Sequence, residues 1–294
     1  LLCNAEGGIL DDIIVYRWEE NRFIIIVNGV NFTKDLEWFK TNCGETTAVE
    51  NLSASRALFA LQGPRSAAIL GELTPQPLAD LYYFRFREDV LGDFPVILAR
   101  TGYTGEDGFE ISVEAVHAVA LWERLREAGK PFGMKLVGLA ARDTLRLEMA
   151  YSLYGMEISE SVSPLEANLE KAVSLKKGDF IGREAIIRIG KESRRTLVGL
   201  EMLDRSIPRH LFRLWSGVTL VGEVTSGSMS PSLGRGIVLA FVQKESSEIG
   251  TILDVEIRGA RRPAVVVRTP FCTPRVYTRS RAARESSRSD RITG

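Results

Sequence analysis

Carboxylate side chains gather in two glycine-punctuated segments, each of which leads into an apolar run of strand-like composition. The first is Asn4-Ala-Glu-Gly-Gly-Ile-Leu-Asp-Asp12, and the second is Gly102-Tyr-Thr-Gly-Glu-Asp-Gly-Phe-Glu110. Glycine lets a backbone approach a ligand closely, and loops held by rigid strands often carry binding groups. The three acids of the second segment therefore indicate a polar binding turn, with solvated turn residues as the alternative.

The neighbouring acids Asp11 and Asp12 precede an apolar strand. Because side chains alternate along a strand, we expect the two carboxylates on opposite faces, one able to point into a cleft and the other toward solvent. Two acids at the start of a strand are also common as plain turn residues. The pattern leaves both interpretations open.

Glu110 lies within a stretch of alternating character, Phe109-Glu-Ile-Ser-Val113. The apolar residues at 109, 111 and 113 face one side, so Glu110 and Ser112 face the other. A carboxylate placed there can accept two hydrogen bonds from an N–C–N edge such as a pterin or guanine presents. An exposed glutamate on the face of a strand is the alternative.

Other polar residues have two interpretations as well. Tyr103 can stack on a heterocycle or pack in the core. Residues 139–149 predict a helix on which Arg142 and Arg146, four apart, share a face. Two cations on one face either pair with acids or hold an anion. The segment Thr225-Ser-Gly-Ser-Met-Ser-Pro231 is either a polar binding loop or an ordinary barrel corner.

Composition excludes several classes of protein. The chain has 294 residues, 45% of them hydrophobic, with 38 Lys and Arg against 38 Asp and Glu, so bulk charge points to neither a nucleic acid nor a membrane. No apolar run approaches the roughly 20 residues of a membrane span. The three cysteines Cys3, Cys43 and Cys272 form no Cys-x-x-Cys pair, and only His117 and His210 are present. We therefore expect no metal site and no disulfide framework, as in a reducing compartment.

Strands and helices interleave through about residue 149. We expect strands at 13–16, 23–27, 57–61, 94–99 and 109–113, and helices at 33–40, 65–73, 114–128 and 139–149. Thr33 is the expected N-cap of the first helix, Pro64 suits the start of the second, and Gly129 closes the third. A further helix is expected to open at 177–184. This order favours an α/β or α+β sheet domain.

The pattern of the sequence changes near residue 193. From there the sequence consists of short β-runs separated by Gly/Ser-rich turns, at 197–202, 218–224, 237–241, 253–257 and 264–267. Even spacing of this kind is typical of a small β-barrel or sandwich. We therefore predict a first domain over 1–193, a barrel over 194–273 and a disordered Arg/Ser-rich tail over 274–294. A nucleic-acid arm is the alternative for the tail.

Six blocks of the sequence carry a family resemblance, in order and over nearly the whole chain to about Phe271. They are Asn4–Asp12, Leu61-Gln-Gly-Pro64, Gly102–Glu110, Gly138-Leu-Ala-Ala-Arg-Asp143, Asp179-Phe-Ile-Gly-Arg-Glu184, and Gly222-Glu-Val-Thr-Ser-Gly227 with Ser230-Pro-Ser-Leu233. Together they resemble the T protein of the glycine cleavage system, a folate-dependent aminomethyltransferase. The chain starts at Leu1 without Met, as though within a strand, and we expect an N-terminally truncated piece.

The resemblance implies an α+β protein in which a folate-binding α/β region of two subdomains, the first incomplete here, precedes a small β-barrel. It implies an enzyme that takes the aminomethyl group from the dihydrolipoyl arm of the H protein. The one-carbon unit passes to tetrahydrofolate, ammonia leaves, and 5,10-methylenetetrahydrofolate forms. The lipoyl group comes from the partner, and neither metal, nucleic acid nor membrane is implied. The compartment is the cytoplasm in a prokaryote and the mitochondrial matrix in a eukaryote.

The resemblance also implies roles for particular residues. The family's essential aspartate falls on Asp12, which would orient the folate amines and stabilise the cationic iminium that forms as ammonia leaves. Its pterin-holding glutamate falls on Glu110, and Tyr103 matches a pocket tyrosine. Arg142 matches a binding arginine that either clamps the folate tail or opposes Asp12. Tyr83 matches another pocket aromatic.

Three other interpretations compete with this one. A folate-dependent demethylase module of the dimethylglycine or sarcosine dehydrogenase type shares the fold. A non-catalytic folate-binding factor of iron–sulfur assembly does so too, but that group carries a Cys where this chain has Asp179. An inactive fragment is the third. The sequence alone leaves the oligomeric state and the source open.

Overall fold

The computed structural model describes residues 1–281 and 283, and the chain folds as two compact units. Unit 1 combines Leu1–Val49 with Arg146–Cys272, and unit 2 combines Glu50–Leu145 with the described residues from Thr273 onward. Unit 2 is therefore inserted into unit 1 along the sequence. Within the described residues no helix has the length and apolar character needed to cross a membrane.

Unit 1 starts with two antiparallel strand pairs and a helix. The strand pairs are β1 (Leu2–Cys3) with β2 (Ile9–Asp11), and β3 (Ile14–Glu19) with β4 (Arg22–Ile26). The expected strands at 13–16 and 23–27 are thus confirmed, with ends shifted by one or a few residues. Helix α1 (Phe32–Asn42) follows. The expected N-cap Thr33 is wrong, because Asn31 occupies that position and Thr33 lies inside the helix.

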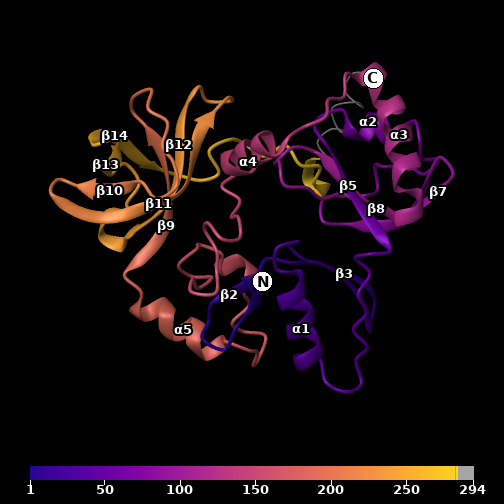
Figure 1. Cartoon of the computed structure of the whole chain (residues 1–294), viewed down its shortest axis with the longest axis horizontal. Coiled ribbons are helices and arrows are strands. Elements are labelled where there is room, and N and C mark those ends of the chain that lie inside the picture. The colour runs from indigo at the N-terminus through magenta and orange to yellow at the C-terminus, as the bar shows by residue number, and fades with distance from the viewer. Residues whose placement is uncertain (282, 284–294) are drawn as a thin grey trace. The chain divides into compact units, whose positions relative to one another are not determined.

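Unit 2 is a four-stranded antiparallel sheet covered by helices on one face (Figure 1). The sheet order β5-β8-β7-β6 joins β5 (Arg56–Gln62), β6 (Phe86–Leu91), β7 (Phe94–Ala99) and β8 (Gly108–Glu114). The helical elements are α2 (Ser66–Gly71), η1 (Ala115–His117), α3 (Ala118–Gly129) and η2 (Lys130–Phe132). The core forms where Phe109 and Ile111 of β8 meet Leu70 of α2 and Leu121 of α3.

Two details of unit 2 differ from the expected helix ends. Gly129 does not close the third helix in a left-handed turn: its φ is −77°, and the left-handed residue is Gly133, with φ of 71°. Glycine is needed at 129 for another reason, since a Cβ there would lie 2.7 Å from the side chain of Met134. Pro64 lies ahead of the N-cap residue Arg65 and is therefore outside α2.

Helix α4 (Leu139–Glu148) matches the prediction, and the chain then returns to unit 1. The connection to the barrel contains an isolated bridge between Tyr154 and Ile158, the short helix η3 (Glu170–Ala172) and helix α5 (Arg183–Glu192). Helix α5 begins within the segment where a helix was expected to open, and its fully buried Ile186 anchors it.

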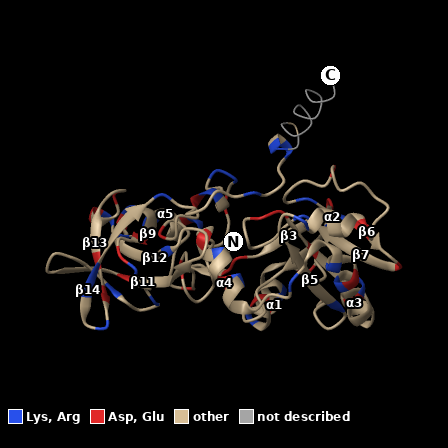
Figure 2. Ribbon diagram, turned by 90° about the horizontal axis from the view of Figure 1, so that it is seen from above, with Lys and Arg blue, Asp and Glu red and all other residues tan. Residues whose placement is uncertain are grey.

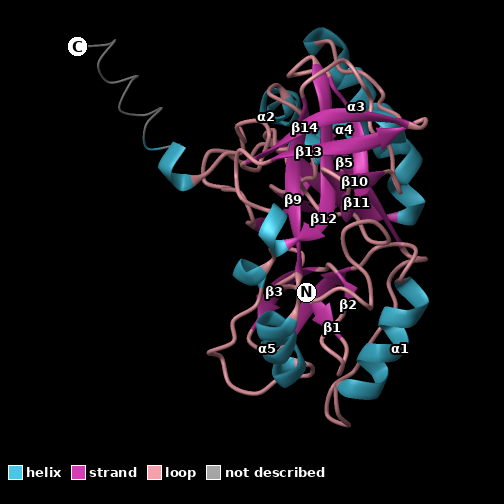
Figure 3. Cartoon of the chain, turned by 90° about the vertical axis from the view of Figure 1, so that its left-hand side faces the viewer, coloured by secondary structure: helices cyan, strands magenta, loops and turns pink. Residues whose placement is uncertain are grey.

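A closed six-stranded barrel forms the rest of unit 1 and confirms the predicted fold class (Figure 3). Its strands in barrel order are β10 (Arg213–Ser216), β11 (Thr219–Ser230), β12 (Arg235–Gln243), β9 (Arg195–Met202), β14 (Ala260–Val267) and β13 (Ile252–Ile257), with the short helix η4 (Lys244–Ser246) after β12. Strand β13 pairs with β10 and closes the ring. The sequence analysis missed β10, which contributes a single buried residue, Leu214.

The predicted boundary near residue 193 falls between α5 and β9. The predicted tail starts at Pro274, and its first residues are described: the Tyr277 ring stacks 6.0 Å from the Tyr82 ring. Residue 282 and residues 284–294, also assigned to that tail, lie outside the described residues. Figure 2 shows acidic and basic residues interspersed along the ribbon of both units, and the totals of the two charges are equal.

Candidate functional site

The side chain of Asp11 is completely buried at the end of β2 and is surrounded by amide donors. Its Oδ2 accepts a hydrogen bond from the backbone N–H of Asn28 at 2.9 Å. Its Oδ1 accepts from the side-chain amides of Asn28 at 2.8 Å and Asn31 at 2.5 Å. Three N–H donors therefore converge on this carboxyl group. Asp11 is thus an internal acceptor and not a solvated turn residue.

Asp12 is half-buried and shares a partner with Asp11. The Asn28 side-chain amide donates to Asp12 Oδ1 at 2.7 Å as well as to Asp11. The expected divergence of the two carboxylates is therefore wrong, because β2 ends at Asp11 and strand alternation does not extend to Asp12. Burial, with a smaller contribution from the charge of Asp11, raises the pKa of Asp12 to about 6 despite the hydrogen bond from Asn28. Such a carboxyl can exchange a proton near neutral pH.

A third aspartate, which the sequence analysis missed, belongs to the same cluster. Asp35 lies in the first turn of α1, and its side chain is completely buried. Burial and the neighbouring Asp11 raise the pKa of Asp35 to about 7, while Lys34 opposes the shift. The available signal was spacing: Asn31 and Asp35 are four apart and face the same way on a helix.

In unit 2, Glu110 occupies the face of β8 that alternation predicts. Phe109, Ile111 and Val113 are fully buried in the core, and Glu110 is half-buried on the opposite face. Glu110 Oε2 accepts a hydrogen bond from Thr101 Oγ1 at 2.5 Å. Its Oε1 accepts none from the residues that the structure describes. One oxygen is therefore fixed and the other is available to a ligand.

Tyr103 and Arg142 are brought together within unit 2. The Arg142 guanidinium carbon lies 4.6 Å from the centre of the Tyr103 ring, a cation–π distance. Tyr83 belongs to the same unit, where its N–H donates to the Tyr277 carbonyl at 2.9 Å and its ring centre lies 4.4 Å from that of Phe84. Four of the five predicted site residues thus belong to unit 2, and Asp12 belongs to unit 1.

One acid of the glycine-rich turn has a purely internal partner. Asp107 forms a two-point ion pair with the buried Arg100, at 2.8 Å to Nε and 2.5 Å to Nη2. The Arg100 guanidinium also lies over the rings of Phe109 and Tyr277, at 4.9 and 3.8 Å. Asp107 therefore fixes the shape of the turn that presents Tyr103.

Family models match both parts of the chain. The GCVT N-terminal domain matches residues 1–177, and the glycine cleavage T-protein C-terminal barrel domain matches residues 195–272. The aminomethyltransferase of Symbiobacterium thermophilum is 48% identical over 281 residues, covering 92% of this chain and 75% of that protein. The aminomethyltransferase of Shouchella clausii is 43% identical over 273 residues, covering 92% of this chain and 74% of that protein.

This chain belongs to the glycine cleavage T-protein family. The resemblance found in the sequence is thereby confirmed, and the relatives are named as aminomethyltransferases, which favours that interpretation over the demethylase and the iron–sulfur factor. A solved structure agrees: the glycine cleavage system aminomethyltransferase T from Bartonella henselae has a TM-score of 0.84 at 33% identity, covering 94% of this chain and 76% of that one.

Unit 1 also contains a buried ionic network, in which Arg146 pairs with an acid, one of the two alternatives that the sequence left open for the arginine face. Arg146 is 2% exposed, and its Nη1 donates to Glu157 Oε2 at 2.9 Å. Its Nη2 donates to Ser226 Oγ at 2.8 Å, and Thr225 Oγ1 donates to Glu157 Oε1 at 2.6 Å. The 225–231 segment thus lies largely within β11, and these two hydroxyls serve the network. Arg142, which was expected to share a face with Arg146, is exposed.

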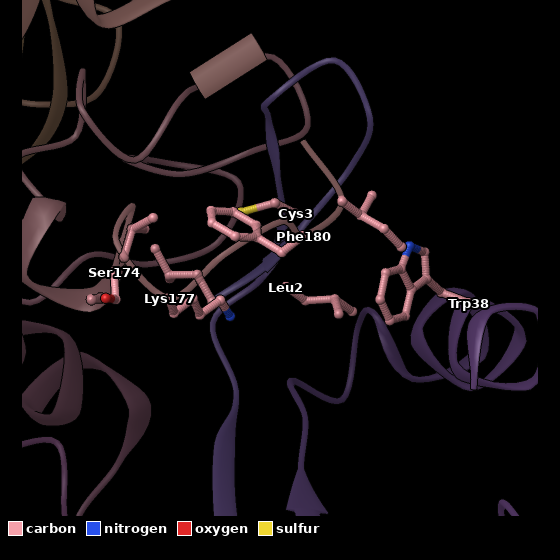
Figure 4. Close-up of a pocket in the computed structure, with 10 residues that line it drawn as sticks. Leu2, Cys3, Trp38, Ser174, Lys177 and Phe180 are labelled. Carbon is pink, nitrogen blue, oxygen red and sulfur yellow. The ribbon is translucent and has the colours of Figure 1, made fainter. Parts of the chain in front are cut away.

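A separate hollow of about 350 Å³ lies beside β1 in unit 1 (Figure 4). It is lined mainly by apolar side chains, among them Leu2, Cys3, Trp38 and Phe180, and Lys177 also lines it. Burial raises the pKa of the Cys3 thiol, so the thiol stays protonated and unreactive. No predicted site residue lines this hollow. Within residues 1–281 and 283, no group of three His, Cys, Asp or Glu side chains could hold a metal ion.

Proposed function

We propose that this T-protein family member transfers a one-carbon unit from the aminomethyl-dihydrolipoyl arm of the H protein to tetrahydrofolate. The carbon loses its bonds to sulfur and to the amino nitrogen and gains bonds to N5 and N10 of the folate. The two folate N–H protons balance the thiol and the ammonia that leave. The product is 5,10-methylenetetrahydrofolate. The match of both family domains, in order, supports this proposal.

The observation that carries the folate assignment is the state of Glu110. Its Oε2 is fixed by Thr101, and its Oε1 accepts no hydrogen bond from the described residues. A carboxylate held in this way has a preset direction in which to accept the N–H donors of a pterin ring. Tyr103, with Arg142 over its ring, would offer an aromatic face beside the pterin. Tyr83 would add a second aromatic wall.

Asp12 would supply the acid–base and electrostatic part of the reaction. Its raised pKa of about 6 lets the carboxyl take up and release a proton near neutral pH. In its ionised form it would stabilise the cationic iminium that forms as ammonia leaves. Asn28 fixes Oδ1 of this group, which leaves Oδ2 for the folate amines.

We also propose the sequence division given above: residues 1–193 hold the folate, 194–273 form the barrel domain, and 274–294 are a tail. The named relatives come from bacteria, and a cytoplasmic location with a lipoylated H protein as partner follows for a bacterial enzyme.

The first test is calorimetric titration of the chain with tetrahydrofolate. We expect saturable binding that Glu110→Gln weakens by about 1–3 kcal/mol, or roughly 5- to 150-fold, the cost of spoiling a hydrogen bond to a charged group. The matched control is Glu88→Gln on the same sheet, where the side chain is exposed. We expect that variant to bind as the wild type does.

The outcomes separate the parts of the proposal. Equal affinity of Glu110→Gln and wild type would remove Glu110 from the pocket while leaving the folate assignment intact. No binding by the folded wild-type chain would contradict the proposed function. Binding followed by transfer from aminomethyl-loaded H protein, measured as ammonia released, would establish the reaction.

A further inference from the structure

Asp11 and Asp35 interact with each other, but their surroundings differ sharply. Both side chains are completely buried, and burial together with the nearby Asp11 raises the pKa of Asp35. Asp11 accepts three N–H donors, whereas neither oxygen of Asp35 has a donor among the described residues. The pair is therefore asymmetric: Asp11 is surrounded by N–H donors, and Asp35 has none among the described residues.

Physical chemistry then decides where a proton would reside. A buried carboxylate without a donor is costly, and two neighbouring carboxylates cannot both ionise without strong repulsion. Negative charge is better accommodated at Asp11, whose three N–H donors include the side chain of Asn31, the N-cap residue of α1. A proton on Asp35 relieves both costs, because the neutral acid can donate a hydrogen bond to Asp11.

The rest of the cluster is arranged around this charge. Asn31 is the N-cap residue of α1, a position where asparagine usually bonds to the helix backbone, yet its side chain makes no such bond and donates to Asp11 instead. Asn28 divides its amide between Asp11 and Asp12. The orientation of Asn28, and with it that of Asp12, therefore depends on Asp11 remaining a single, fixed anion.

We propose that Asp35 is a positioning residue that holds one proton against Asp11 and thereby fixes Asn28 in the orientation that binds Asp12. The consequence for catalysis rests on the proposed function, in which Asp12 acts on the folate. The groups that face Asp35 are Asp11 from β2 and Lys34 from α1 itself, and Lys34 is held by Tyr154 and Glu160 at 2.6 and 3.0 Å. When Asp35 ionises, repulsion from Asp11 would disturb Asn28 and release Asp12.

The direct test is the infrared absorption of protonated carboxyl groups in the intact chain. Asp12→Asn is the background, because Asp12 also titrates close to neutral pH. We expect a buried carboxylic-acid band that disappears with a midpoint near pH 7 and that is absent from the Asp12→Asn/Asp35→Asn double variant. A band that persists in the double variant, or no band below the midpoint, would overturn the proposal. Neither the presence of the band nor its midpoint depends on transfer activity.

Activity supplies the second test, in chains that carry Asp12. Asp35→Leu cannot donate to Asp11, and we expect kcat to fall by about 10- to 100-fold, as for other misplaced reacting groups. Asp35→Asn supplies an uncharged donor, so we expect it to recover part of that loss and to lack the decline in kcat above about pH 7. Equal losses in both variants, with an unchanged pH profile, would mean that Asp35 only supports packing. Absence of transfer in the wild type would contradict the proposed function and leave the infrared result standing.

Discussion

Breaking the buried ion pair of Arg146 and Glu157 is expected to leave a charge without a partner inside unit 1. In Arg146→Met the aliphatic volume stays similar, but hydrogen bonds to Glu157, Ser226 and the Tyr151 carbonyl are lost. Removing one member of a buried pair typically costs about 3–5 kcal/mol. Glu157 keeps donors from Thr225 and the Leu153 N–H, at 2.6 and 2.9 Å, so we expect a loss near the lower end, about 3 kcal/mol.

The substitution of Glu157 is the sharper test, because its effect on the free energy of unfolding should change sign between the wild-type and the Arg146→Met background. Glu157→Gln alone destabilises the chain, since Arg146 is then the uncompensated charge. In the Arg146→Met background the same change removes the unpaired carboxylate and keeps an acceptor for Thr225. There we expect it to restore about 2 kcal/mol of the free energy of unfolding.

The measurement is equilibrium urea unfolding followed by tryptophan fluorescence. Trp18, Trp38 and Trp215 belong to unit 1, and Trp122 belongs to unit 2, so a Trp122→Phe background confines the signal to the unit that holds the ion pair. Arg235→Met, also in unit 1, is the matched control: its pair with Glu201 is 51% and 21% exposed, and we expect a change below about 1 kcal/mol. If Glu157→Gln destabilised both backgrounds equally, the reasoning about an uncompensated charge would be refuted.

Two further predictions concern the acid cluster and its backbone. Asp12→Asn should abolish transfer, yet it should become more stable than the wild type as the pH rises. The pKa of Asp12 is about 6 in the folded chain and about 3.9 in the unfolded chain, so the free energy of unfolding of the wild type falls as the pH rises between those values. The advantage of the variant should therefore grow from about pH 4 to a plateau above about pH 6, reaching at most about 3 kcal/mol, and a pH-independent difference in urea unfolding would contradict this. Gly8→Ala should cost about 2 kcal/mol or more, because its Cβ would lie 1.7 Å from the Glu160 carbonyl oxygen. Gly29→Ala, with nothing within 4 Å of its Cβ, is the control, and similar urea midpoints for the two variants would show that the backbone yields.

The sequence predicted the features that depend on the local alternation of apolar and polar residues. Glu110 was placed on the outer face of its strand because Phe109, Ile111 and Val113 must face the core, and these three are fully buried. Its partner Thr101 could not be predicted, since that contact needs the register in which Ala99 lies opposite Glu110. Register belongs to the sheet and not to either strand.

Burial of charge was the least predictable feature. The sequence analysis made no prediction for Asp35, and it placed Arg146 only on a helix face shared with Arg142. Both are buried because their partners come from elsewhere in the sequence, Asp11 in one case and Glu157 in the other. Strand β10 was not predicted for a related reason. Its four residues include one buried side chain, and it is pairing with β11 and β13 that makes it a strand.

The insertion of unit 2 within unit 1 has a consequence for synthesis of the chain. Residues 1–49 leave the ribosome before unit 2, but the Ile9 N–H bonds to the Ser159 carbonyl and Lys34 pairs with Glu160, and both partners follow residue 145. At about 5–20 residues per second, translation of 50–145 takes roughly 5–20 s. The contiguous sheet β5–β8 can form in that time, while Ile9 of β2 still lacks the Ser159 and Val162 carbonyls to which its N–H bonds. Residues 1–49 are thus synthesised before unit 2 but completed after it, and nascent β2 is the segment that a chaperone would be expected to shield.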